Sequence, residues 1–114
     1  MAFDAELTER FRTLLGDQPG LSEKKMMGGI CFFAHGNMIG GADRSKSGER
    51  RFMFRVGKDN AEAAERLEGG VDMVHGGRRM SGLYFVDADK ISNEAVAKWV
   101  ALALAHARSL PAKT

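Results

Sequence analysis

The hydrophobic positions at both ends of the chain recur at helical spacing. Near the N-terminus apolar residues return every three or four positions, after acidic residues and before a glycine, which predicts a helix near residues 4–15. A longer stripe follows Ser92, a good N-cap, and must end before Pro111. The second helix is therefore predicted to bury one face, formed by Val96, Trp99, Val100, Ala103, Leu104 and Ala107.

The middle of the chain has the pattern of strands separated by turns. Residues 30–35 are almost wholly apolar, which predicts a strand covered on both faces at the centre of the sheet. Gly36-Asn37 can supply the positive-φ positions of a tight turn, so residues 38–42 should return antiparallel. Residues 51–56 alternate with period two, which places Phe52, Phe54 and Val56 in the core and Arg51, Met53 and Arg55 outside.

Three weaker segments complete the predicted elements. Residues 22–27 form a short strand that enters a glycine pair, and residues 59–68 form a modest surface helix. Residues 82–86 form the last strand. Strands joined by short turns pair antiparallel, so we expect an α+β fold with a mainly antiparallel sheet and both long helices packed on one face. At 114 residues without a visible linker, the chain is expected to be a single domain, residues 1–114.

Composition limits the class of protein. No apolar run approaches the roughly 20 residues of a membrane-spanning helix, and the N-terminus lacks the basic and apolar start of a secretory signal. Cys31 is the only cysteine, so no disulfide can form within the chain, which fits a reducing compartment. We therefore expect a cytoplasmic protein.

Charge is nearly balanced overall but uneven locally. The formal charge is +2, too small for the field of the whole molecule to favour nucleic acid. Between residues 44 and 58, however, the only acid is Glu49, and we call the six bases there the basic stretch: Arg44, Lys46, Arg50, Arg51, Arg55 and Lys58. These residues are candidates to bind an acidic protein partner or phosphate. An ordinary solvated surface is the alternative, because no stacking aromatic residues are interleaved on the exposed face.

Few residues have the spacing of a catalytic or metal site. Cys31 and His35 on one strand would lie about 13 Å apart, too far for base activation of the thiol, so we expect a buried, unreactive cysteine. The three histidines lack zinc spacing. Asp87 and Asp89 could hold Mg²⁺, but acids ahead of a capped helix also stabilise its N-terminus. The four glycine pairs lack a phosphate-binding motif and predict turns and bulges. We expect no enzyme, cofactor or metal.

Several short motifs are spaced over nearly the whole chain. They are Lys25-Met26-Met27-Gly28-Gly29, Gly36-Asn37-Met38, Arg55-Val56-Gly57, Met80-Ser81-Gly82, and Trp99 with Ser109-Leu110-Pro111. Together they resemble the N-terminal domain of the TfoX/Sxy competence regulators. The chain departs from the family at Met27, where an aromatic residue is usual, and at residues 44–50, where the family has a shorter link.

The resemblance implies an α+β domain of regulators that switch on DNA-uptake genes together with a cyclic-AMP receptor protein. We expect a stand-alone N-terminal domain, without the C-terminal domain of the full-length regulators. The function implied is a non-catalytic module in transcription regulation that acts through protein–protein contacts with a regulatory partner. Two alternatives stay open: direct nucleic-acid binding through residues 44–58, and a small enzyme with a polar site assembled by the fold.

One face of the predicted sheet has no helix to cover it. If both long helices share one face, Phe32 or Phe33 with Met38 or Ile39 would form an exposed apolar patch on the other. We therefore expect a homodimer in which this surface meets itself across a two-fold axis. The alternative is that the short helix or the loop at residues 43–50 covers the patch in a monomer.

Overall fold

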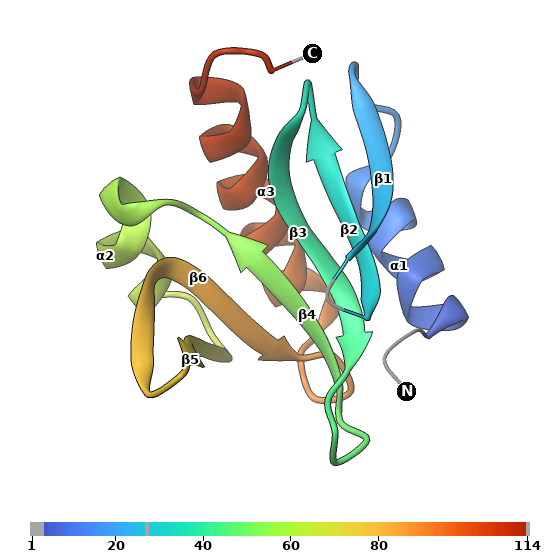
Figure 1. The fold of residues 1–114 in the computed structure, drawn as a ribbon, viewed down its shortest axis with the longest axis vertical. Coiled ribbons are helices and arrows are strands. Elements are labelled where there is room, and N and C mark those ends of the chain that lie inside the picture. The colour runs from blue at the N-terminus through green and yellow to red at the C-terminus, as the bar shows by residue number, and fades with distance from the viewer. Residues whose placement is uncertain (1–3, 27, 114) are drawn as a thin grey trace.

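The computed structural model describes residues 4–26 and 28–113 of the chain. Figure 1 shows an α+β fold in which one antiparallel sheet carries the helices on one side, as predicted. The elements are α1 (Ala5–Leu15), β1 (Leu21–Met26), β2 (Gly29–Ala34), β3 (Asn37–Arg44), β4 (Arg50–Arg55), η1 (Lys58–Asn60), α2 (Ala61–Glu65), β5 (Gly70–His75), β6 (Arg78–Asp87) and α3 (Asn93–Ser109).

The two long helices begin at side-chain caps. The carboxylate of Asp4 accepts a hydrogen bond from the Leu7 N–H at 2.9 Å, and the Ser92 hydroxyl accepts one from the Ala95 N–H at 3.1 Å. Each bond satisfies a backbone donor that has no partner within the first turn of the helix. The predicted helices at both ends of the chain are therefore confirmed, and the predicted surface helix is shorter, Ala61–Glu65 after a 3₁₀ turn.

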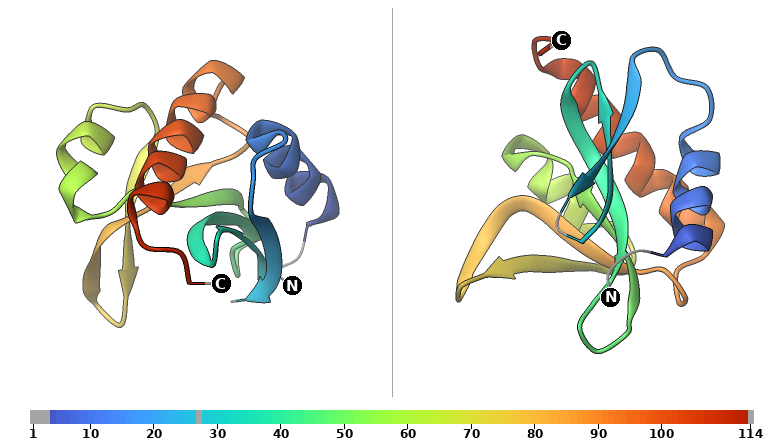
Figure 2. Two further views of the ribbon diagram at one scale, coloured as in Figure 1. Left: turned by 90° about the horizontal axis from the view of Figure 1, so that it is seen from above. Right: turned by 45° about the vertical axis from the view of Figure 1, so that its right-hand side comes forward.

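The sheet has six strands in the order β1-β2-β3-β4-β6-β5. Helices α1 and α3 pack on one face of it, as predicted (Figures 1 and 2). The other face carries Cys31, Met53 and Phe85, and in the described part of the chain no helix packs on it. We call this side the open face.

An aromatic cluster joins the helices to the sheet. The rings of Phe11 and Phe32 stack with centroids 4.5 Å apart, and Phe54 stacks on Trp99 at 5.8 Å. Trp99 is fully buried, and its indole N–H donates to the Glu68 carbonyl at 2.9 Å. The predicted alternation of β4 is confirmed, because its core-facing aromatic residues contact α1 and α3 while Arg51 and Met53 lie on the open face.

The turn between β2 and β3 lies one residue earlier than predicted. His35 and Gly36 occupy it with φ of 49° and 83°, while Asn37 already pairs with Ala34 in the sheet. Two consecutive positive φ angles give the twist that suits a two-residue hairpin. His35 is therefore exposed in the turn, so the prediction that it shares a strand with Cys31 is wrong.

The structure contains a strand that the sequence pattern did not predict. A hairpin of β5 and β6 follows α2, where we expected a single strand at residues 82–86, and Gly76-Gly77 form its turn. Strand β6 bends at Gly82, whose φ is 80°, so that only residues 83–87 pair with β4. The predicted strand at residues 22–27 is confirmed as β1, except for Met27, which lies outside the described residues.

A candidate binding pocket on the open face

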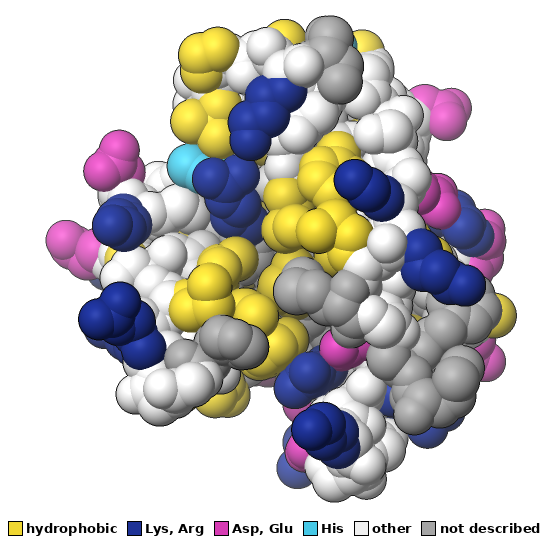
Figure 3. Space-filling model, viewed as in Figure 1, with side chains coloured by type: hydrophobic (Ala, Val, Ile, Leu, Met, Phe, Trp, Pro, Cys, Tyr) yellow, Lys and Arg dark blue, Asp and Glu magenta, His cyan; other side chains and the backbone are white. Residues whose placement is uncertain are grey.

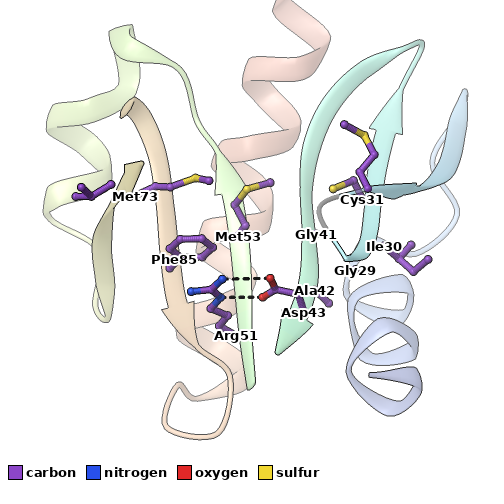
Figure 4. A pocket seen from close by; sticks show the side chains of 12 residues that line it. Gly29, Ile30, Cys31, Gly41, Ala42, Asp43, Arg51, Met53, Met73 and Phe85 are labelled. Carbon is purple, nitrogen blue, oxygen red and sulfur yellow. Dashed lines mark hydrogen bonds and ion pairs between the residues drawn. The ribbon is translucent and has the colours of Figure 1, made fainter. Parts of the chain in front are cut away.

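A pocket of about 320 Å³ lies on the open face. It touches both edges of the sheet, since Met26 comes from β1 and Val74 from β5. In a flat six-stranded sheet those edges would stand about 24 Å apart, so the sheet must curve around the pocket. This open-face pocket is lined by Met26, Gly29, Ile30, Cys31, Gly41, Ala42, Asp43, Arg51, Met53, Met73, Val74 and Phe85 (Figure 4).

The pocket wall is mainly apolar and rich in sulfur. Met73 of β5 points toward Met53 of β4, and Phe85 of β6 lies beside them (Figure 4). Methionine is unbranched and polarisable, so a wall of this kind can repack around apolar groups of different shape. Figure 3 shows hydrophobic side chains gathered over the middle strands and over the β5–β6 hairpin on this face, with Lys and Arg side chains beside them.

One end of the pocket is closed by an ion pair. The Arg51 guanidinium donates to the Asp43 carboxylate at 2.8 and 3.2 Å and lies over the Phe85 ring, 3.8 Å from its centroid (Figure 4). Both charged side chains are half-buried. Arg51 is thus held in place by a carboxylate and an aromatic ring, and it supplies a polar boundary to an apolar space.

Cys31 lies in the wall of the pocket with 3% of its surface exposed. Burial raises the pKa of its thiol, and the nearby Asp43 carboxylate raises that pKa further. Both effects disfavour the thiolate, which is the reactive form. The predicted burial of Cys31 is confirmed.

The basic stretch is divided between two ends of β4. Arg44 and Arg50 both donate to the Asp4 carboxylate, at 2.9 and 3.0 Å, and Arg50 also pairs with Glu6 and Asp89. Arg55 stands at the far end of the strand, about 16 Å from Arg50, and Lys58 follows it in η1. Lys46 is exposed in the loop between β3 and β4. The six residues therefore do not share one surface.

Asp4 organises the first of these groups. Burial alone would raise the pKa of its carboxyl, but hydrogen bonds from the Leu7 N–H and from the Arg50 and Arg44 guanidinium groups outweigh that effect. The net pKa is lowered, so Asp4 is ionised at neutral pH. A single carboxylate thus caps α1 and holds two of the predicted phosphate-binding arginines.

The other candidate polar groups are used in local structure. The Asp89 N–H donates to the Asp87 carboxylate at 3.0 Å, and the Asp89 carboxylate pairs with Arg50 at 2.8 Å. His106 is half-buried on α3, where burial, and then the charge of Arg55, lower its pKa. The side chain of His75 lies outside the description. Over residues 4–26 and 28–113, no three His, Cys, Asp or Glu side chains gather as metal ligands would.

Comparison with models of known protein families places the chain in one of them. The family model of the TfoX N-terminal domain matches residues 13–107, most of the chain's length. The chain belongs to this family. The TfoX N-terminal domain is a domain of competence regulators and is generally a non-catalytic regulatory domain. Searches among curated proteins and among solved structures return no match.

The motifs that pointed to the TfoX N-terminal domain have two kinds of role in the structure. Most shape the backbone: Gly28 and Gly36 adopt positive φ in turns, and the Asn37 side chain donates to the Pro111 carbonyl at 3.0 Å. Two others, Met26 and Gly29, line the open-face pocket. Lys25 is exposed on β1, and Met27 lies outside the described residues.

Sequence reasoning found only part of the pocket. Met73, Val74 and Phe85 were missed because β5 was not predicted and because β6 was given no outward face. The available signal was Gly76-Gly77, a glycine pair that favours a tight hairpin turn. Of the alternatives given for the apolar patch, Phe32 and Ile39 are buried in the helix-side core, which leaves Phe33 and Met38.

Proposed function

We propose that this TfoX N-terminal domain is a non-catalytic regulatory module that binds an apolar segment of a protein partner in the open-face pocket. The observation that supports this is the pocket itself, a curved apolar space lined by methionines on a sheet face that both long helices leave free. Concave, mostly apolar pockets with a few polar groups are the usual form of binding sites. The place of the family in competence regulators favours transcription control as the process, and we propose the cytoplasm as its location.

The charges around the pocket favour a partner segment with acidic flanks. Lys24 pairs with Cys31 in the β1–β2 register and Arg55 with Leu83 in the β4–β6 register, which puts both cations on the open face. The acid within the pocket, Asp43, is already bound to Arg51. An apolar side chain flanked by Asp or Glu would match both the wall and the rim of the pocket.

The test compares two methionines of the same hairpin. Met73 lines the pocket, whereas Met80 is 37% exposed on β6 and is not part of the pocket wall. We expect Met73→Asp to lose partners that wild-type protein captures from the native cytoplasm, by about tenfold or more, because a carboxylate would enter the apolar wall. Met80→Asp should keep them. Equal capture by both variants would exclude the pocket as the binding site.

Direct nucleic-acid binding through the basic stretch is the first alternative. Asp4 and Asp43 neutralise three of its arginines, Arg44, Arg50 and Arg51, which reduces the charge offered to phosphate. We expect no retention on immobilised nucleic acid at low ionic strength. Strong retention that falls steeply with added salt, and is weakened by Lys46→Ala or Lys58→Ala, would support the alternative instead.

A small enzyme with a fold-assembled site is the second alternative. Such a site needs acid, base or nucleophile groups that converge on a space for substrate. The charged groups of the open-face pocket, Asp43 and Arg51, are bonded to each other, and the Cys31 thiol is shifted away from its reactive form. These contacts favour the binding module over the enzyme.

A further inference from the structure

The two edges of the sheet differ in their protection against strand pairing. Strand β1 carries Glu23, Lys24 and Lys25 in succession, and charges of this kind discourage another strand from joining an edge. Strand β5, the other edge, has the sequence Gly-Val-Asp-Met-Val-His with one acid, Asp72. That acid lies 3.3 Å from the Arg79 guanidinium of the neighbouring strand. The β5 edge is therefore the less protected of the two.

The β5 edge also exposes apolar side chains. Val71 is 64% and Val74 58% exposed, the highest values for large hydrophobic side chains among the described residues. Val71 pairs with Phe85 across the hairpin, and Val74 lines the same pocket as Phe85. Val71 therefore lies on the open face, because residues opposite each other in an antiparallel pair share a face.

We propose that β5 pairs with β5 of a second copy of this chain, antiparallel across a two-fold axis perpendicular to the sheet. In one register Val71 lies opposite Val71 of the second copy, and Asp72 lies opposite Gly70, so that the residues of each pair share a face. The two Val71 side chains then cover each other, and no acid faces an acid. The two sheets join into one, with both open faces on the same side.

A second copy suits this edge better than an unlimited series of strands. A two-fold contact uses both β5 edges and leaves only the charged β1 edges, so the assembly closes at two chains. A contact between two open faces, the dimer that the sequence suggested, would bring two concave surfaces together and enclose a void. Edge pairing leaves the open-face pockets accessible, so this inference stands whether or not the pocket binds a partner.

The first test measures association by sedimentation at concentrations across the micromolar range. We expect a monomer–dimer equilibrium for the wild type and a dissociation constant raised about tenfold or more by Val71→Lys, since the two-fold axis sets the two new charges opposite each other. Met80→Lys is the control on the inner strand of the same hairpin. Because Val71 is 64% exposed, its variant should fold, which thermal unfolding verifies. A wild-type monomer at every concentration would overturn the proposal, as would a dimer that Val71→Lys leaves unchanged.

The second test addresses register. Val71→Cys should form a disulfide-linked dimer under mild oxidation, because the two copies of this position face each other across the axis. Val74→Cys should crosslink poorly, since its own copies would stand about 20 Å apart. The wild type, whose one cysteine, Cys31, is buried, measures background crosslinking. Absence of the Val71→Cys disulfide would overturn the proposed register, and a monomer that instead takes up an extended peptide at β5 would overturn self-pairing.

Discussion

At the scale of single residues, Asp4 joins a helix end to two distant arginines. Its carboxylate accepts hydrogen bonds from Leu7, Arg44 and Arg50, and its pKa lies below the ordinary value of 3.8. A lowered folded-state pKa means that the ionised group stabilises the fold above pH 3.8 and that this stability is lost as the pH falls through the folded-state pKa.

We therefore expect Asp4→Ala to lower the free energy of unfolding at pH 7 by about 1 kcal/mol or more from loss of the cap alone. Urea unfolding at pH 7 and near pH 3 measures this. Between pH 7 and pH 3 the free energy of unfolding should also fall less for the variant than for the wild type. Asp4→Asn is the matched control, because it can still cap α1 but carries no charge for the arginines. An unchanged pH dependence in Asp4→Ala would contradict this role.

Cys31 provides a second prediction at this scale. Because burial and the Asp43 charge both raise the pKa of the thiol, it should react with iodoacetamide at least about tenfold more slowly in the folded protein than in denaturant at pH 7.5. Mass spectrometry of timed samples gives the rates. Rapid labelling of the native protein would mean that the pocket wall opens readily.

The burial of single residues could be predicted from the sequence better than their charged partners could. Burial of Trp99 and the facing of β4 followed from regular spacing, which is a local property of the chain. The partners of Arg50 and Arg51 did not follow. Asp4 is 46 positions from Arg50, and Asp43 reaches Arg51 only because β3 and β4 pair in one particular register. Charge pairs of this kind depend on tertiary structure.

At the scale of elements, the strands that alternate or are wholly apolar were predictable and β5 was not. Residues 70–75 mix glycine, an acid and a histidine with two valines, so neither periodicity appears. The segment forms a strand because Gly76-Gly77 turn the chain and β6 offers a partner. The pairing with β6, and not the composition of β5, defines this strand.

The bend in β6 gives a prediction for an element. The Val56 and Gly57 N–H groups both donate to the Gly82 carbonyl, and a Cβ on Gly82 would come within 2.6 Å of the Gly57 carbonyl carbon. We expect Gly82→Ala to destabilise the fold by several kcal/mol, since it adds a clash to the strain of a positive φ.

Gly76→Ala is the control for that variant. Gly76 also has a positive φ, 59°, but a Cβ there would meet nothing within 4 Å. Gly76→Ala should lower the free energy of unfolding by only about 1 kcal/mol. Chemical denaturation of the two variants compares them directly. Similar losses would show that the close approach of β6 to Gly57 is easily relieved.

At the scale of the whole molecule, Trp99 links three parts of the fold. It stacks on Phe54 of β4, packs on Tyr84 of β6, and hydrogen-bonds the carbonyl of Glu68 just before β5. Trp99→Ala should lower the free energy of unfolding by about 3–5 kcal/mol. Lys98→Ala, exposed on the same helix, should change it little. A loss below about 1 kcal/mol for Trp99→Ala would show that α3 is peripheral to the core.

The layered architecture could be predicted from the sequence, whereas its curvature could not. Two amphipathic helices and short turns are sufficient to indicate an antiparallel sheet with helices on one side. The pocket depends on how strongly the sheet coils and on the bend at Gly82, and both result from packing across the whole domain. No helix in residues 4–26 and 28–113 is long and apolar enough to cross a bilayer.

The strand order also has a consequence for motion. In the sheet as described, β4–β6 is the one pairing between strands that are not consecutive, and it holds only residues 83–87 of β6. The outer part of the β5–β6 hairpin can therefore open without disturbing β2, β3 or β4. Amide hydrogen exchange should then be fast at residues 74–79 and slowest in β2–β4. If β5 pairs with a second copy, the exchange of β5 amides should slow as the protein is concentrated. Strand β5 would then be the most easily opened strand of the monomer and a protected strand in the dimer.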